Sequence, residues 1–395
     1  MNTKVSFIAL LTLAVSTTCA ATEPLSPDSV LTAAVETPAQ PAATTSNAAP
    51  QDRDDTWLQS LKKMVKLSGY LQTGYQYNSL GEHTSSFQAK RLRLIADGYV
   101  GSKVSFRLQI EAFNGIAGST NGNGQKNLQV MDAFATMELN KAFKVRVGQY
   151  YLPIGYENYD SSPSILETVD FSDICYRMVC RNAITYNVVD YGRDLGVMVF
   201  GDVAPSDKGF NYLSYVLSLT NGSLPSKDDV DKSKDLVAAL TVRPFKHFSL
   251  KGSFNWGQYT GTVNAVKYKN QDMFRYVVGA WYNNPAGLDV RAEYGHIASA
   301  ANGADVIKED GFYALAAYNI GKWAPVVRYS MYRDRVNKST LNNYDALLCG
   351  VTYHFNQRWK LQANYIYTMY TDEAKVTNNN QGASSKLQIM GMYKF

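Results

Sequence analysis

From Val65 to the end of the chain, hydrophobic and polar residues alternate in short segments. In "VKLSGYLQTGYQYN" (65–78) valine, leucine and tyrosine occupy one set of alternate positions, and lysine, serine, glutamine and asparagine occupy the other. "KVSFRLQIEAF" (103–113) and "RWKLQANYIYTM" (358–369) repeat the pattern. Because successive side chains of a β-strand point to opposite faces, a period of two predicts strands with one apolar and one polar face.

The pattern predicts sixteen strands with turn residues between them. Their ranges are 65–79, 86–100, 102–113, 127–140, 142–151, 192–202, 209–221, 235–243, 247–259, 272–283, 287–299, 311–320, 323–333, 344–355, 358–370 and 385–395.

The connections alternate in length. Short links such as "VGS", "NKA" and "GKW" interleave with longer polar ones such as "GIAGSTNGNGQK" and "NGSLPSKDDVDKSK". Short turns at one end, long loops at the other and an even strand number are typical of outer-membrane barrels. Unpaired backbone groups are costly in hydrocarbon, so the sheet has to close. We therefore predict an all-β fold, a 16-stranded antiparallel transmembrane β-barrel. Trp281, Trp323, Trp359 and Phe395 lie near the short-turn end, where a membrane interface favours aromatic residues.

The third long connection is unusual in length. "VRVGQYYLPIGYEN" (145–158) begins as a strand, ends at Pro153 and Gly155, and no comparable alternation returns until about Arg193. Connections of this length in compact domains are usually functional. We expect this loop to fold into the lumen and to set its narrowest cross-section, because a 16-stranded barrel is wide enough for water.

Basic residues outnumber acidic ones on the polar face. Parity places thirteen basic residues in the lumen, namely Lys66, Arg91, Arg93, Lys103, Arg107, Lys144, Arg146, Lys251, Arg275, Arg291, Arg328, Lys360 and Lys386. Six acidic residues share that face: Glu111, Asp132, Glu138, Asp194, Asp289 and Glu293. Charges must avoid lipid in any case, so part of this set is ordinary solvated surface. Arg91, Arg93 and Arg107 should cluster on neighbouring strands, and arginine suits phosphate and carboxylate oxygens. They predict a path for anions.

The long loop adds "CYRMVCR" (175–181), which places Arg177 and Arg181 beside Cys175 and Cys180. An exported protein could bridge these cysteines and stiffen the loop. Two unbridged thiols in a surface loop are the alternative.

The N-terminus predicts export. Lys4, an apolar run from Val5 to Val15 and small residues near Ala21 are typical of a signal peptide, here residues 1–21. Residues 22–64 begin with a segment rich in Ala, Thr and Pro and are expected to form a flexible periplasmic leader, with the barrel over 65–395. Removal of Lys4 lowers the net charge from +5 to +4, which gives no indication of nucleic-acid binding.

Other functions find less support. The four histidines, His83, His247, His296 and His354, form no convincing nucleophile arrangement for a protease or lipase, so no enzyme is predicted. No metal cluster or cofactor motif is evident. A closed barrel used for adhesion and a general, weakly selective porin for small polar nutrients remain as alternatives.

Several segments together resemble the phosphate-selective porins of the O and P type. They are "FQAKRLRL" (87–94), "MDAFATMEL" (131–139), "VRVGQYYLPIGYE" (145–157), "GRDLGVMVFG" (192–201), "YVLSLTNG" (215–222) and "YHFNQRWKLQANY" (353–365). The resemblance implies an outer-membrane homotrimer in the lipid bilayer that passes inorganic anions such as phosphate or polyphosphate, or small polar solutes. Arg91 and Arg93 match the family's basic pair, Arg146 matches its strand-to-loop motif, and Arg177, Arg181 and Arg193 match approximately.

The long loop departs from the family pattern in its charge. Residues 152–194 contain seven acidic residues and three arginines. Such a loop attracts phosphate poorly unless its acids face the barrel wall or solvent, and the sequence leaves that question open.

Overall fold

We analysed a computed structural model of the chain, which describes residues 64–80, 85–113, 128–180, 192–222, 229, 233–263, 266–284 and 287–395. Backbone contacts divide the chain into Met1–Arg53 and Asp54–Phe395. The expected signal peptide and nearly all of the expected leader lie outside the described residues, so those boundaries stay predictions.

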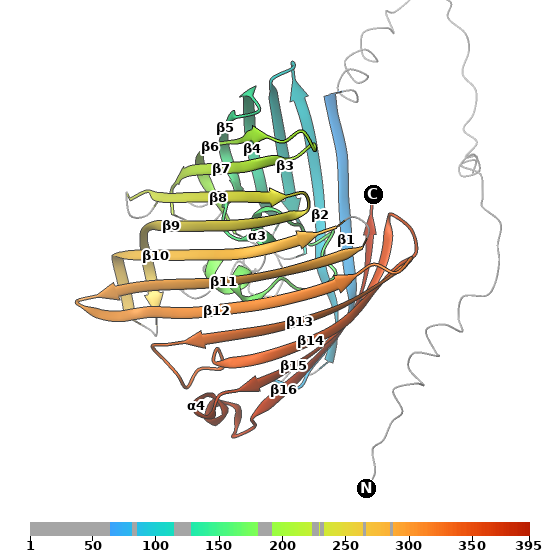
Figure 1. Ribbon diagram of the computed structural model, residues 1–395. Coiled ribbons are helices and arrows are strands. Elements are labelled where there is room, and N and C mark those ends of the chain that lie inside the picture. The colour runs from blue at the N-terminus through green and yellow to red at the C-terminus, as the bar shows by residue number, and fades with distance from the viewer. Residues whose placement is uncertain are drawn as a thin grey trace, which may run out of the picture. The chain divides into compact units, whose positions relative to one another are not determined.

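Sixteen antiparallel strands form one closed barrel, as predicted (Figure 1). The strands are β1 Val65–Asn78, β2 Ser85–Val100, β3 Val104–Glu111, β4 Gln129–Asn140, β5 Phe143–Tyr151, β6 Arg193–Pro205, β7 Asn211–Thr220, β8 Asp235–Phe245, β9 Phe248–Val263, β10 Val266–Asn283, β11 Leu288–Ala301, β12 Ala304–Tyr318, β13 Trp323–Asp334, β14 Tyr344–His354, β15 Trp359–Tyr370 and β16 Ala383–Lys394. Short helical segments are α3 Tyr156–Tyr159, η1 Ile174–Val179, α4 Asp372–Lys375 and η2 Val376–Asn378.

The first and last strands close the barrel. β1 pairs with β16 in the register Tyr75 to Ile389. At the short-turn end, the amide nitrogens of Gly69 and Phe395 each donate to the other residue's carbonyl oxygen, at 3.0 and 3.1 Å. Each strand therefore has a partner on both sides, which satisfies the backbone groups that hydrocarbon would leave unpaired.

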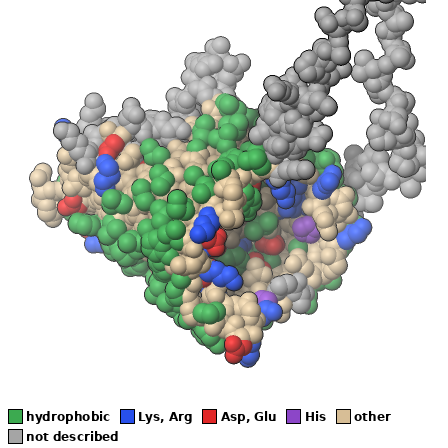
Figure 2. All heavy atoms as spheres, turned by 90° about the horizontal axis from the view of Figure 1, so that it is seen from above, with side chains coloured by type: hydrophobic (Ala, Val, Ile, Leu, Met, Phe, Trp, Pro, Cys, Tyr) green, Lys and Arg blue, Asp and Glu red, His purple; other side chains and the backbone are tan. Residues whose placement is uncertain are grey.

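The alternation of side chains also follows the prediction. On β2 the arginines at 91 and 93 are 0% and 1% exposed, whereas Leu94 is 46% exposed on the outer face. Figure 2 shows hydrophobic side chains gathered on the outer surface beside a hollow with charged side chains. Trp323, Trp359 and Phe395 are exposed at the short-turn end, as expected of an aromatic belt.

Trp281 does not belong to the aromatic belt in which the sequence placed it. Its indole Nε1 donates to Asp289 at 2.8 Å, and its ring lies against the Tyr156 ring and the Arg291 guanidinium, so it faces the lumen. The reason is parity, because Trp281 is separated from the luminal Arg275 by an even number of positions on β10.

Two outer connections differ from their predicted lengths. β9 and β10 continue as strands to Val263 and Val266, and β11 and β12 continue to Ala301 and Ala304. The polar residues expected to form loops there extend the hairpins instead, since strand pairing outside the membrane does not need an apolar face. No helix among the described residues is long and apolar enough to cross a membrane.

The connection between β5 and β6, residues 152–192, is here called the inner loop. It carries α3 and η1, which Figure 1 shows against the inner side of the strands. Its apolar side chains Leu152, Ile154, Ile174, Met178 and Val179 pack with residues of β8 and β10–β14 in one buried cluster. The predicted folding of this loop into the barrel is confirmed for its described residues.

Candidate functional site

The inner loop is first held where it leaves β5. Gly155 has φ of 68°, in the left-handed region that glycine tolerates, and an added Cβ would lie 2.9 Å from Glu293 Oε1. The turn lets the Gly155 amide donate to Ser253 Oγ at 3.1 Å and the Tyr156 amide donate to Glu293 Oε1 at 2.6 Å. Lys251 Nζ donates to the Gly155 carbonyl at 2.9 Å. The turn at residues 153–155 therefore fixes the start of the inner loop to β9 and β11.

A second group of contacts joins the middle of the loop to β15 and β2. The Leu166 carbonyl accepts from Lys360 Nζ at 2.7 Å and from Gln362 Nε2 at 2.9 Å. The Val169 amide donates to Asn364 Oδ1 at 2.7 Å, and its carbonyl accepts from Arg91 Nη1 at 3.1 Å. Buried backbone groups of an irregular segment need such partners, and luminal side chains supply them here.

Asp170 contacts several polar side chains of the wall. Its carboxylate accepts from Gln388 Nε2 at 2.7 Å and pairs with Lys386 Nζ at 3.0 Å and with Lys90. Burial alone would raise the pKa of the Asp170 carboxyl, but Lys386, Lys90 and Arg91 together hold that pKa well below its usual range. Asp170 is therefore a charged anchor.

The third group of contacts holds η1. Arg275 Nη1 donates to the carbonyls of Met178 and Val179, the latter at 3.0 Å, and Arg177 Nη2 pairs with Glu309 Oε1 at 3.0 Å. The wall makes room with glycine, since a Cβ at Gly295 would come within 2.8 Å of Met178 Sδ. Arg177 therefore forms an ion pair with the barrel wall.

The structure shows no disulfide between Cys175 and Cys180, which are both buried. They lie at the two ends of one π-helical turn, in which the Cys180 amide donates to the Cys175 carbonyl at 2.9 Å. Both pack with Leu166 and Phe171. The turn is stabilised by backbone hydrogen bonding and packing, so it holds its shape without a bridge.

Glutamates and aspartates in the described part of the inner loop face the barrel wall. Glu157 and Glu167 each lie 3.9 Å from Arg291 Nη2, and Asp160 pairs with Lys251 Nζ. Burial raises the pKa of the Glu167 carboxyl, and Arg291 offsets part of that rise. These carboxylates neutralise basic residues of β2, β9, β11 and β16, which answers the question that the charge of the loop raised.

Two more of the predicted arginines have carboxylate partners on the strands. Arg93 Nε lies 2.9 Å from Glu111 Oε2, with both side chains 1% exposed. Arg193 donates to the Asp132 carboxylate from Nε at 2.6 Å and from Nη2 at 3.2 Å. The guanidinium carbon of Arg193 lies 3.4 Å from the centroid of the Tyr151 ring. Arg181 lies outside the described residues, and its expected role stays a prediction.

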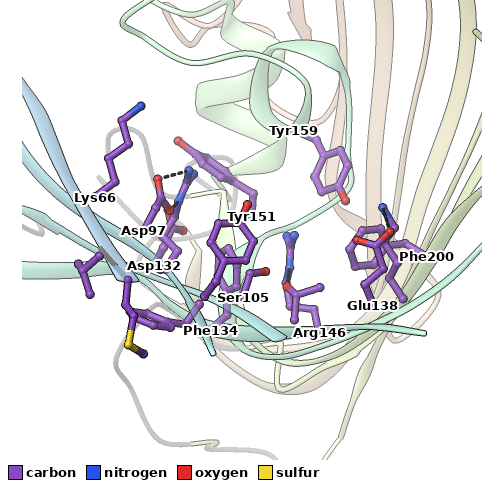
Figure 3. A pocket seen from close by; sticks show the side chains of 18 residues that line it. Lys66, Asp97, Ser105, Asp132, Phe134, Glu138, Arg146, Tyr151, Tyr159 and Phe200 are labelled. Carbon is purple, nitrogen blue, oxygen red and sulfur yellow. Dashed lines mark hydrogen bonds and ion pairs between the residues drawn. The ribbon is translucent and has the colours of Figure 1, made fainter. Parts of the chain in front are cut away.

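An open cavity of about 890 Å³ remains beside the loop, in the short-turn half of the lumen (Figure 3). Strands β1–β6 line it, and Tyr151 and Tyr159 border it from β5 and α3. Its wall includes the basic residues Lys66, Arg107, Lys144 and Arg146 and the acidic residues Asp97, Asp132 and Glu138.

The comparisons with known proteins agree with this architecture. The family model of the phosphate-selective porins O and P matches residues 65–278. The chain belongs to the phosphate-selective porin O and P family. It is an outer-membrane porin, a channel and not an enzyme.

Solved structures show the same fold at low sequence identity. An anion-selective porin from Comamonas acidovorans is 14% identical, with 84% of this chain and 99% of that chain covered and a TM-score of 0.58. The outer-membrane channel DcaP of Acinetobacter baumannii is 15% identical, with 84% and 97% covered and a TM-score of 0.55. OmpF of Salmonella typhi, solved with daunomycin, is 13% identical, with 84% and 97% covered and a TM-score of 0.58. No curated protein sequence matches the chain.

Most charges in the cavity of this porin are paired. Arg107 Nε lies 2.6 Å from Asp97 Oδ1, and Lys144 Nζ lies 3.5 Å from Glu138 Oε1. Asp132 is held by Arg193, as described above. Among the described residues, no carboxylate lies within 4 Å of Lys66 or Arg146, so these two cations remain uncompensated.

Arg146 has a distinctive environment in the porin. Its guanidinium lies between the rings of Phe134 and Phe200, at 4.2 and 4.9 Å from their centroids, and Nε donates to Thr136 Oγ1 at 3.0 Å. The sequence pattern predicted Arg146 as a luminal residue, but not the two phenylalanines beside it. The alternation in "MDAFATMEL" could have identified Phe134, because it lies an even number of positions from the luminal Asp132 and Glu138 and so shares their face.

Proposed function

We propose that this porin allows passive diffusion of small hydrophilic solutes and passes anions more readily than cations. The observation that carries the proposal is the pair of uncompensated cations, Lys66 and Arg146, in the cavity beside the inner loop. The other described charges of that cavity lie in ion pairs. The net field that a passing ion meets is therefore positive.

The expected preference is moderate. An anion about 4 Å from one unit charge gains about 1 kcal/mol at the dielectric constant of water, which corresponds to roughly a fivefold change in local concentration. Conduction needs sites that are weak enough to release the solute. Two separated cations in a wide cavity suit rapid passage of chloride, phosphate or a similar anion better than one deep binding site would.

Of the seven arginines that the sequence suggests for the path, the six described ones divide into two roles under this proposal. Arg146 and, to a lesser extent, Arg107 border the cavity and act on the solute. Arg91, Arg93, Arg177 and Arg193 contribute mainly by holding the inner loop and the wall in place, since each has partners in the protein. The anion selectivity of the Comamonas acidovorans porin supports an anion path on this fold.

Reversal potentials of the purified porin in a potassium chloride gradient test the proposal. We expect chloride to permeate better than potassium near 0.1 M salt, where the Debye length of about 10 Å leaves the luminal field effective. Lys66→Ala and Arg146→Ala should each lower the chloride-to-potassium permeability ratio by up to about fivefold. Lys375→Ala is the control, because Lys375 pairs with Asp372 at the surface of an outer loop.

If the ratio is near one and neither cavity variant changes it, the anion path is wrong and the general, weakly selective porin is the better description. A purified barrel that carries no current would instead favour the structural or adhesive role.

We also propose that the mature porin begins after residue 21, that residues 22–64 form a periplasmic leader, and that three copies assemble. OmpT of Vibrio cholerae, 12% identical, has been solved in a trimer form, and the exposed apolar outer face could serve both lipid and neighbouring copies. Native mass spectrometry in detergent tests the cleavage site through the mass of the subunit and the copy number through the mass of the assembly.

A further inference from the structure

The cavity that holds the two uncompensated cations has an aromatic lining. Phe106, Phe134 and Phe200 from the strands and Tyr151 and Tyr159 at the loop border it. Figure 3 shows Arg146 among Phe134, Tyr151, Tyr159 and Phe200, whereas Lys66 lies toward the opposite side. Apolar surface and positive charge therefore meet in one compartment.

The guanidinium of Arg146 presents its edge to this compartment. Its central carbon lies over the rings of Phe134 and Phe200, and Nε donates to Thr136 Oγ1. Among the described residues, no acceptor lies within hydrogen-bonding distance of Nη1 or Nη2, and neither atom is a buried one. Those nitrogens are the donors of a fork that matches a carboxylate.

A multiply charged, strongly hydrated anion gains less from such a site. Phosphate has to exchange water for several donors, because a charge that leaves water without new hydrogen bonds loses much free energy. Here one fork is available, and its surroundings are aromatic rather than polar. A planar carboxylate with an apolar body would use the fork at one end and the rings at the other.

The size of the compartment also favours an organic anion over a small inorganic one. About 890 Å³ falls in the range of roughly 300–1,000 Å³ that is typical of sites for organic ligands. A chloride or phosphate ion would contact one wall only, whereas an organic anion could contact a ring and the fork at the same time.

From this juxtaposition we propose that the preferred solutes are organic monocarboxylates with an aromatic or similarly flat apolar body, held transiently between Arg146 and the rings of Phe134 and Phe200. The proposal rests on the anion preference proposed above and names the class of anion. The hold is weak, so it raises the local concentration of the solute without blocking its release.

The test compares benzoate, acetate and phosphate as potassium salts. Reversal potentials with chloride on the opposite side give the permeability of each anion relative to chloride. We expect benzoate to permeate better than acetate although it is larger, and better than phosphate. Each single variant, Phe134→Leu and Phe200→Leu, should lower the benzoate-to-acetate ratio by about two- to tenfold.

Phe274→Leu is the matched control, because Phe274 lies on the outer face at 42% exposed and should leave all ratios unchanged. A wild-type benzoate-to-acetate ratio of one or less, with chloride preferred over potassium, would overturn this inference and leave the proposed function standing. A ratio that both phenylalanine variants retain would also overturn it. A porin with no preference for chloride would overturn both proposals together.

Discussion

Replacing Asp170 by asparagine should increase anion selectivity by releasing luminal cations. The change preserves shape and removes one negative charge from the inner loop. In the wild type, this carboxylate neutralises Lys90 and Lys386, and among the described residues it is the only carboxylate within 4 Å of either lysine. The asparagine keeps one carbonyl oxygen for Gln388, which contacts Asp170 Oδ2 at 2.7 Å.

The magnitude follows from the contacts. A hydrogen bond to a charged group contributes about 1.5–3 kcal/mol. The lower end applies to Lys386, whose side chain is 30% exposed, so two such contacts sum to roughly 3 kcal/mol of lost anchoring. Each ammonium group left uncompensated attracts an anion at about 4 Å by about 1 kcal/mol in water. The chloride-to-potassium permeability ratio should therefore rise about fivefold or more.

The assay is single-channel recording in a potassium chloride gradient near 0.1 M salt, with Asp372→Asn as the control. Asp372 is an exposed acid of an outer loop, paired with Lys375, so its loss should not change the lumen. Weaker anchoring should also increase open-channel noise. An unchanged ratio, or one displaced toward potassium, would refute the view that the loop acids neutralise the wall.

The contribution of Asp170 to the stability of the porin depends on pH. The folded-state pKa of Asp170 lies below its unfolded value of about 4. Its contribution to stability is therefore fully present above pH of about 4 and is lost only as the pH falls through the lower, folded-state pKa. The difference in unfolding free energy between the wild type and Asp170→Asn should therefore stay constant from pH 7 to 5. It should disappear in stronger acid, where the Asp170 carboxyl is protonated.

Two further predictions concern stability and thiols. Arg193→Ala leaves the buried Asp132 without its main cation and should cost about 3–5 kcal/mol, seen as a lower thermal unfolding midpoint; a midpoint like that of the wild type would contradict this role. Unreduced, denatured mature porin should react with alkylating reagent at Cys175, Cys180 and Cys349, whereas modification of Cys349 alone would mean that the bridge forms after all.

The sequence determined which residues face the lumen. On β2 and β5, arginine alternates with leucine or valine, and a period of two in a sheet that lipid surrounds leaves only one orientation. The sixteen strands follow from the same pattern, because each hydrogen-bonded hairpin is local in the chain. Closure follows because hydrocarbon leaves β1 and β16 no other partner for their backbone groups.

The sequence could not distinguish Arg91 and Arg93 from Arg146. All three point inward with the same periodicity, yet Arg91 and Arg93 hold loop and wall, and Arg146 borders the open cavity. The difference depends on where the inner loop lies. That path is set by contacts between residues far apart in the chain, such as Val169 with Asn364 and Asp170 with Lys386.

The tertiary structure therefore decided which luminal charges are neutralised and which remain for a solute. An irregular segment has no period from which its position can be read, and its polar groups bind wherever buried partners happen to converge from several strands. Alternation fixes the face of a strand on which a charge lies, but only the packed loop fixes whether that charge has a partner.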